Sequence, residues 1–209
     1  MPTAQEILTN LQTTVDAYLW LRILHHVFLI LAAIALWRFR QKAGWIATSY
    51  LTFAFFSVFL GGVAPIFNPF YLMVFGILTL LGIWELFNPQ MDFSMRHTPN
   101  IQIAIALVGG FIGFWYPHLV EGGLQSLVAS PLGVIPCPTL LVALSLFLVA
   151  YPQTNKIWQW AVTVMALYFG IVGLFRLKIT LDVAVLALAI YSAYCLIMLG
   201  RKRTESRVA

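Results

Sequence analysis

Residues 18–37 read YLWLRILHHVFLILAAIALW, a run in which Arg22 is the only formally charged side chain. A transmembrane helix needs about 20 mostly apolar residues, so this stretch has the length and character of a membrane span. Six more apolar stretches follow, at roughly 44–66, 69–87, 100–118, 137–151, 156–175 and 179–200. The sequence therefore predicts an all-α, polytopic transmembrane bundle of about seven spans.

The overall composition favours the same class. Hydrophobic residues make up 61% of the 209 residues and charged residues only 9%, whereas soluble domains carry about 25% charged residues. So few charges cannot cover a water-facing surface, and we expect one integral membrane domain over residues 1–209, solvated by the lipid bilayer. The net charge of +5 does not indicate nucleic acid, because the basic residues lie at the ends of the apolar stretches.

Lys and Arg are distributed unevenly between the two sides of this bundle. With the N-terminus outside, nine basic residues fall inside and three outside, and the basic tail 201–209 lies in the cytoplasm. Positive charge favours the inner side, so we predict an N-out, C-in, multi-pass protein of a bacterial inner (plasma) membrane. No basic segment precedes the first apolar stretch, so no cleavable signal peptide is expected.

The segment before the first span, residues 1–17, has a helix of its own. Thr3 and Glu6 fit a capping box, in which a hydroxyl and a carboxylate satisfy free N–H groups at a helix start. Ile7, Leu11 and Val15 then repeat on one helix face. We expect a short interfacial helix that anchors the chain on the outer membrane surface.

Three further patterns concern helix ends and helix packing. All seven Trp residues lie within a few residues of a predicted span end, as expected for side chains that prefer the headgroup layer. Gly109 and Gly113 have the spacing that allows a neighbouring helix to approach closely. Gly170 and Gly173 are expected to allow the same close packing in span six. The stretch 137–151 is short, so it either crosses the membrane or enters as a half-helix from a re-entrant loop.

Ionisable residues at membrane depth are functional candidates, because their burial is costly. Six of them fall in the outer half of the predicted bundle: Arg22, His25, His26, His118, Cys137 and Asp182. One interpretation is a metal, haem or proton site, with His118 and Cys137 as metal ligands. The other is an Arg22–Asp182 ion pair between spans one and seven, with wetted histidines and a cysteine in a tight turn.

Glu85 is a second intramembrane carboxylate, near the inner end of span three. Four basic residues are expected on the same side: Arg38, Arg40, Lys42 and Arg96. The sequence leaves two roles open for Glu85, a structural ion pair with one of these cations or a part in proton-coupled transport.

Residues 136–139 read PCPT, in which two prolines suit the first turn of a helix and Thr139 can bond nearby backbone groups. Together with Asn68-Pro69 and Tyr116-Pro117, this string resembles an uncharacterised membrane family, domain of unknown function 6064, over roughly residues 45–195. The resemblance implies a small polytopic membrane protein and carries no known activity. The stretch 125–128 departs from the His- and Tyr-containing segment that precedes PCPT in the family.

Three functions follow as hypotheses. The first is a non-catalytic accessory or assembly subunit of a membrane complex, or a homo-oligomer, motivated by the glycine faces. The second is a small transporter or channel that uses Glu85 and Asp182. The third is a metal- or haem-handling redox protein. No paired carboxylates, phosphate loop or nucleophile–base pair suggests an enzyme, and the sequence specifies no cofactor.

Overall fold

The computed structural model describes residues 3–61, 69–93, 98–118 and 125–199, and this part of the chain is all helical. Asn68, Arg96, His97, Glu121 and the tail 201–209 lie outside the described residues. In chain order the helices are α1 (Ala4–Ala17), α2 (Leu19–Arg38), α3 (Ala43–Gly61), α4 (Pro69–Phe87), α5 (Asn100–Phe114), α6 (Ser126–Ala129), α7 (Pro136–Ala150), α8 (Lys156–Ile171) and α9 (Asp182–Tyr194). A 3₁₀ turn, η1 (Arg40–Lys42), precedes α3, and π-helical turns η2 (Val172–Arg176) and η3 (Cys195–Leu199) extend α8 and α9.

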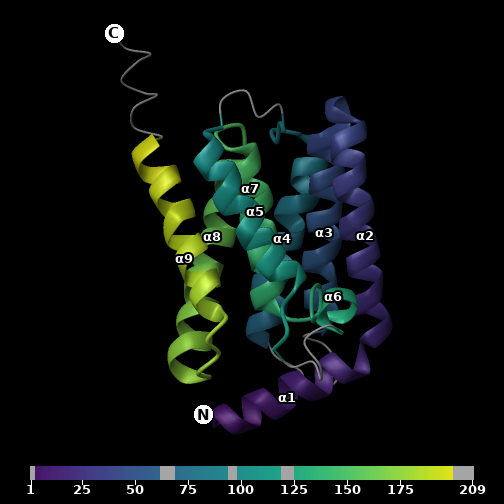
Figure 1. Cartoon of the computed structure of the whole chain (residues 1–209), viewed down its shortest axis with the longest axis vertical. Coiled ribbons are helices and arrows are strands. Elements are labelled where there is room, and N and C mark those ends of the chain that lie inside the picture. The colour runs from purple at the N-terminus through teal and green to yellow at the C-terminus, as the bar shows by residue number, and fades with distance from the viewer. Residues whose placement is uncertain (1–2, 62–68, 94–97, 119–124, 200–209) are drawn as a thin grey trace.

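Seven long helices stand side by side, and α1 lies across one end of them (Figure 1). Most of the seven begin and end within a few residues of a predicted span. Helices α3 and α5 end about four or five residues before their predicted spans do. The last two predicted spans are completed by η2 after α8 and by η3 after α9. Four helical stretches are long and apolar enough to cross a membrane: Leu19–Arg38, Arg40–Gly61, Pro69–Phe87 and Lys156–Arg176. These helices indicate a membrane protein.

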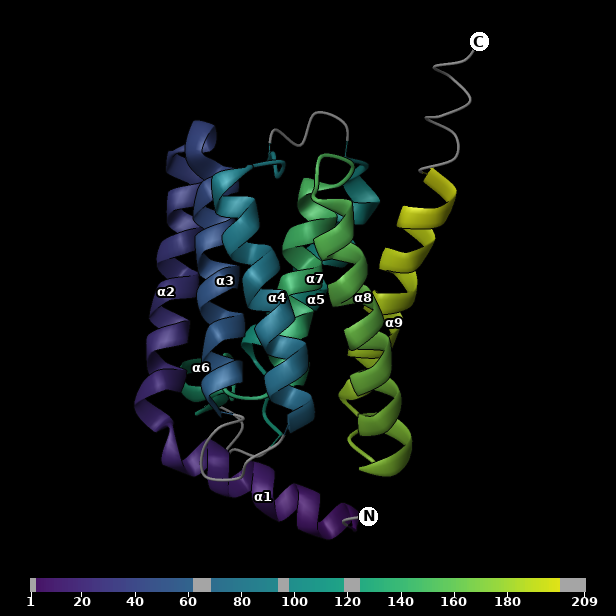
Figure 2. The ribbon, with the colours of Figure 1, turned by 180° about the vertical axis from the view of Figure 1, so that it is seen from behind.

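The N-terminal helix α1 forms as the capping pattern predicts. The Thr3 hydroxyl accepts a hydrogen bond from the Glu6 backbone N–H at 3.2 Å, and the Glu6 carboxylate accepts one from the Thr3 N–H at 2.7 Å. Val15 on its apolar face is fully buried. Seen from both sides, α1 runs beneath the ends of the long helices rather than among them (Figures 1 and 2).

Helix α7 is the centre of the bundle. It packs against α3, α5, α8 and α9, and twelve of its fifteen residues are buried. The short stretch 137–151, for which the sequence allows a crossing helix or a half-helix, is therefore the described helix most enclosed by protein. A helix surrounded by other helices does not have to match the thickness of the bilayer itself, because protein rather than lipid covers its sides.

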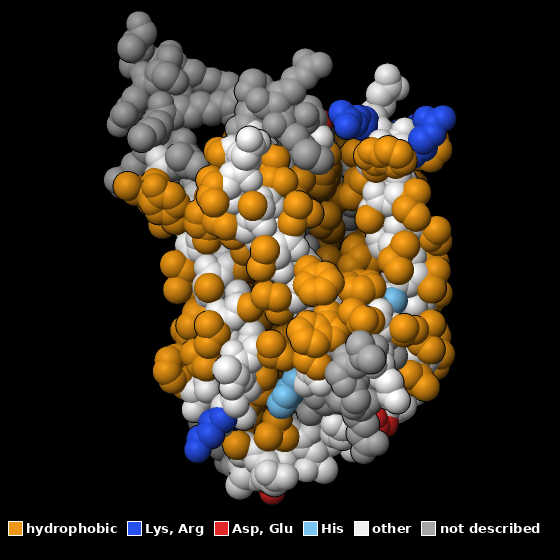
Figure 3. Space-filling model, viewed as in Figure 1, with side chains coloured by type: hydrophobic (Ala, Val, Ile, Leu, Met, Phe, Trp, Pro, Cys, Tyr) orange, Lys and Arg blue, Asp and Glu red, His pale blue; other side chains and the backbone are white. Residues whose placement is uncertain are grey.

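The face of the bundle seen in Figure 3 is largely apolar between its two ends, and the Lys and Arg side chains visible on it lie at those ends. Six of the tryptophans are at least partly exposed near helix ends, as expected for headgroup anchors. Trp158 departs from this prediction. Its ring is fully buried, edge-on to Phe55 and Phe147, with Gly82 close to its outer edge. Trp158 is therefore a core residue at the start of α8.

The glycines of α5 serve packing within the chain. A Cβ added at Gly113 would crowd Leu141 and the Pro138 carbonyl of α7, and one at Gly109 would crowd Leu188 of α9. The close approach that their spacing predicts is therefore made by neighbouring helices of the same chain.

The segment before α7 folds back into the bundle. Leu132, Val134 and Ile135 are buried although they belong to no helix. Gly133 takes a φ of +73° and lies against the His25 ring, a position and conformation that exclude a side chain. The Thr139 hydroxyl accepts from the Gly133 N–H and donates to the Ile135 carbonyl, both at 2.9 Å, so the local bonding predicted for Thr139 is confirmed.

Candidate functional site: a buried carboxylate beside a cavity

Asp182, the first residue of α9, is fully buried at the end of the bundle where α1 lies. The Tyr116 hydroxyl, just beyond α5, donates a hydrogen bond to its Oδ1. The Cys137 thiol, in the first turn of α7, donates to its Oδ2 at 3.4 Å. The start of α9, the start of α7 and the segment just after α5 therefore meet at one carboxylate, and among the described residues its side-chain partners are neutral donors.

Gly173 in η2 completes the wall around this carboxylate. A Cβ added there would overlap Asp182 Oδ2, so only glycine lets the η2 backbone approach so closely. The nearby Gly170 likewise abuts the Leu186 backbone of α9. The glycines of span six therefore bring α8 and η2 against the start of α9, as their spacing predicted.

A cavity of about 240 Å³ borders this cluster. Tyr116, Cys137 and Gly173 form part of its wall, and Ile7 and Leu11 of α1 close it from the end of the bundle. Arg176 of η2 also lines it. The aromatic part of the wall comes from α4 and α8: Phe70, Tyr71, Tyr168 and Phe169. The cavity is thus mainly apolar and aromatic with a few polar groups, as small-molecule sites commonly are.

The three predicted site residues in α2, Arg22, His25 and His26, do not join this site. Arg22 is buried where α1 turns into α2, and it donates to the Val15 carbonyl at 3.1 Å. Helices α2 and α9 stand on opposite sides of the bundle (Figure 1). The predicted Arg22–Asp182 ion pair is therefore wrong, because the fold places α5 and α7, not α2, beside Asp182.

The two histidines of α2 face different neighbours. His25 Nε2 lies 2.9 Å from the Ser57 hydroxyl of α3, and its ring stacks on Phe53. His26 lies with Nδ1 2.8 Å from the Arg22 carbonyl and Nε2 3.1 Å from the Phe114 carbonyl. Both rings are buried rather than wetted at the interface, and they tie α2 to α3 and α5.

His118 lies next to the Asp182 cluster, edge-on to the Tyr116 ring at 6.5 Å between centroids. Its Nε2 is buried and has no hydrogen-bond partner in the described part of the chain. Cys137 acts as a donor to a carboxylate here rather than as a thiolate. Within the described ranges, no three His, Cys, Asp or Glu side chains are grouped to hold a metal. The His118–Cys137 metal site stays a prediction.

Glu85 lies at the other end of the bundle and binds the backbone of the loop that follows α4. One oxygen accepts from the Gln90 and Met91 backbone N–H groups, and the other accepts from Asn155 Nδ2 at 2.9 Å. Asn155 in turn caps α8 by accepting from the Trp158 N–H at 3.1 Å. The described partners of Glu85 are neutral, so a hydrogen-bonded clamp takes the place of the expected pair with Arg38, Arg40 or Lys42.

A second polar layer lies toward this same end, between α8 and α9. Gln159 Nε2 donates to Ser192 at 3.3 Å, and Thr163 lies 2.9 Å from the same hydroxyl. Ser192 is ten residues from Asp182, about 15 Å along α9. Buried Leu144 and Leu188 belong to the stretch between the two layers. The polar groups are thus grouped at two depths with an apolar layer between them.

Tyr116 is the site residue that the sequence did not reveal. Its hydroxyl group was visible only as part of a Tyr-Pro pair at the end of a span. The available signal was general: a buried tyrosine hydroxyl usually finds a hydrogen-bond partner. Its partner belongs to α9, 66 positions later in the chain, and no spacing rule links the two.

The fold and this site define an all-helical membrane protein with a buried carboxylate beside a small cavity. Comparisons with protein-family models, with curated proteins and with solved structures returned no match.

Proposed function

We propose that the chain is a seven-span protein of a bacterial inner (plasma) membrane, N-out and C-in, which binds a small ligand at its outer face without chemical conversion. The observation that carries this proposal is the buried Asp182, whose two donors, Tyr116 and Cys137, form part of a cavity wall. A carboxylate kept at membrane depth is costly, and such residues commonly mark ligand or ion sites.

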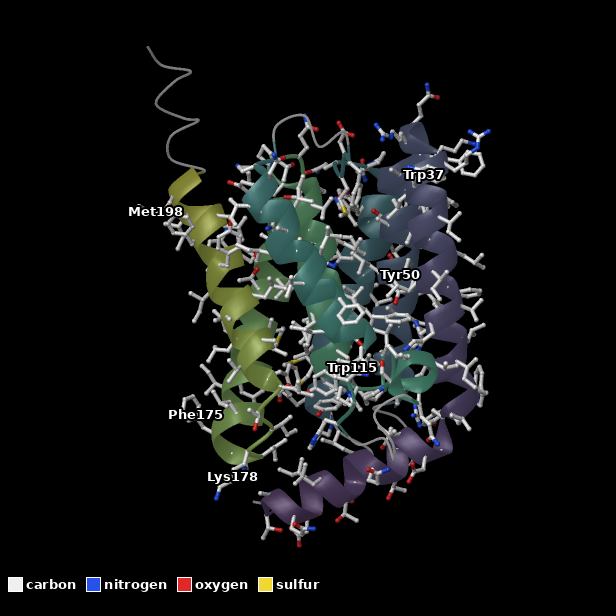
Figure 4. The ribbon with its side chains drawn as sticks, viewed as in Figure 1. Trp37, Tyr50, Trp115, Phe175, Lys178 and Met198 are labelled. Atoms are coloured by element: carbon white, nitrogen blue, oxygen red, sulfur yellow. The ribbon has the colours of Figure 1, made fainter. Side chains whose placement is uncertain are left out.

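The seven-span arrangement has two supports. The seven long helices coincide with the seven apolar stretches. The basic residues of the described part also divide between the ends: Arg22, Arg176 and Lys178 belong to the α1 end, and Arg38, Arg40, Lys42 and Lys156 to the opposite end. Figure 4 shows Lys178 near α1, with Trp37 and Met198 at the far end. The full sequence has nine Lys and Arg residues on the predicted inner side and three on the outer side, and by the positive-inside rule this supports an outer position for α1.

Native mass spectrometry of protein extracted gently from its own membrane tests the ligand-binding proposal. We expect a bound small molecule on the unaltered chain and its loss in Asp182→Asn. The matched control is Asp92→Asn, which removes an exposed carboxylate outside the cavity and should keep the ligand. A bare protein, or equal retention in both variants, would contradict ligand binding at Asp182.

A second candidate is an accessory or assembly subunit, or a homo-oligomer. A groove of about 500 Å³ between α5 and α9 favours it, because small side chains line it, among them Ala104, Gly109, Ala184 and Ala187. Small residues let a further helix approach closely in a membrane. In the same spectra, added polypeptide mass that disappears in Ala187→Trp but persists in Ala33→Trp, in a different groove, would support this candidate. Unchanged mass in both variants would count against it.

A further inference from the structure

We propose that the cavity beside Asp182 binds a small zwitterion in which a primary amine and a phosphate are joined by a short linker. This is the chemistry of an aminophospholipid headgroup and of its free, soluble form. The inference rests on the ligand-binding function proposed above and names the class of ligand.

The amine end is assigned to the Asp182 cluster. Tyr116 and Cys137 both give their hydrogens to the carboxylate, so the remaining lone pairs of the oxygen and the sulfur are acceptors. An ammonium group carries three donors and no acceptor, which suits two acceptors on one wall. Its charge would also compensate a buried carboxylate whose described side-chain partners are neutral, and uncompensated buried charge is strongly unfavourable.

The aromatic wall favours the same end group. The four rings from α4 and α8 pack with centroids 5.1–6.2 Å apart in successive pairs: Phe70–Tyr168, Phe70–Phe169, Tyr71–Phe169 and Tyr168–Phe169. A cation within about 6 Å of such a ring face is attracted by the ring quadrupole, more strongly where water is excluded. An anionic or neutral group gains no such attraction.

The phosphate end is assigned to Arg176. This residue lines the cavity three positions after Gly173, whose backbone touches Asp182, so one small cavity has the carboxylate cluster and a cation in or directly behind its wall. A guanidinium group binds phosphate through two parallel hydrogen bonds. A cation and a carboxylate cluster at the same small cavity fit a zwitterion with a short linker better than a simple cation or a simple anion.

The size and opening of the cavity suit a headgroup. About 240 Å³ accommodates a head but not two acyl chains. Tyr168 lines the cavity and is also 45% exposed on the outer surface of α8. A lipid can therefore place its head inside while its chains stay in the bilayer.

The test uses the full chain, delipidated in detergent, and compares mixed micelles of phosphatidylethanolamine, phosphatidylcholine and phosphatidylglycerol with soluble phosphoethanolamine. The readout is the dissociation constant from the rise in thermal midpoint. We expect phosphatidylethanolamine to bind at least about tenfold more tightly than the other two lipids, since hydrogen bonds to charged groups typically contribute enough for that factor. Binding of phosphoethanolamine as well identifies a free metabolite as a ligand. If phosphatidylethanolamine binds and phosphoethanolamine does not, the ligand is the membrane lipid.

Three variants locate the two ends of the ligand. Asp182→Asn should abolish the preference for phosphatidylethanolamine over phosphatidylglycerol. Arg176→Gln should weaken binding about tenfold, while Lys178→Gln, a cation two residues away that does not line the cavity, should change nothing. Arg176 is exposed, so its replacement carries the test even if Asp182→Asn does not fold.

Equal affinity for the three lipids, or equal effects of Arg176→Gln and Lys178→Gln, would overturn the zwitterion proposal. If native mass spectra then still show a small molecule whose binding depends on Asp182, the ligand-binding function stands, and only the assignment of the ligand as a zwitterion is refuted. If no small molecule binds at all, both proposals fall.

Discussion

At the scale of single residues, the site depends on residue 173 being a glycine, which has no side chain. The carboxylate of Asp182 occupies the space in which any side chain of residue 173 would begin. Tyr116 and Cys137 then hold the carboxylate from the other sides. Because a membrane interior offers no water to replace these bonds, each of the four residues constrains the others.

Adding one methyl group tests this constraint. Gly173→Ala should lower the free energy of unfolding by about 1–3 kcal/mol, the usual cost of overpacking a filled core. The matched control is Gly76→Ala in α4, where an added Cβ meets only Phe59 at an ordinary 3.5 Å. That change should be stabilising by about 0.5–1 kcal/mol, because alanine favours a helix more than glycine does. Thermal unfolding in detergent gives both values, and a neutral Gly173→Ala would refute the tight fit.

At the scale of elements, Glu85 joins three pieces of chain. It lies in the last turn of α4, binds the backbone of the loop at Gln90 and Met91, and holds Asn155 at the start of α8. A carboxylate is suited to this position because it only accepts hydrogen bonds, and all three partners are donors. The clamp fixes how α4 and α8 pack at this end.

Replacing the acceptor by an amide should loosen the clamp. In Glu85→Gln one terminal group becomes a donor, and whichever way the amide is turned, at least one partner donor loses its acceptor. We expect a loss of about 1–3 kcal/mol in unfolding free energy. Adding Asn155→Asp should restore part of it, because the carboxylate introduced at position 155 can accept from the new amide and still cap α8. Absence of any rescue in the double variant, measured by thermal unfolding, would speak against the clamp.

At the scale of the whole molecule, α1 and the Lys and Arg distribution give the bundle two different ends. The α1 end contains the Asp182 cluster, the cavity and the buried loop before α7. The opposite end contains Glu85, the second polar layer and four of the seven described Lys and Arg residues. The proposed ligand site therefore faces one side of the membrane only.

Labelling from outside the cell tests which side this is. A membrane-impermeant maleimide should label Gln5→Cys on α1 in intact cells. It should label Gln41→Cys in η1 only after the membrane is permeabilised, because η1 belongs to the opposite, basic end. Both positions are exposed, whereas Cys195 is buried and Cys137 is only partly accessible, so labelling of the unaltered chain measures the background from these two cysteines and serves as the control. The reverse pattern would place the cavity on the cytoplasmic side.

Much of the fold follows from local rules that the sequence states directly. The capping box of α1, the proline start of α7 and the boundaries of most helices depend on residues a few positions apart. Trp158 shows where such rules stop: it lies near a helix end like the other tryptophans, yet its ring is in the core. Position along a helix predicts depth in the membrane, but not the side that the residue faces.

The sequence by itself determined that this is a helical membrane protein, where its helices run, and which ionisable residues would be costly enough to matter. Only the tertiary structure decided that Asp182 meets Tyr116 and Cys137 instead of Arg22, and that Glu85 binds neutral donors. The physical reason is that lipid is as apolar as a protein core. The lipid-facing and protein-facing sides of these helices are therefore similar in sequence. Which helices become neighbours cannot be predicted from the pattern of apolar residues alone.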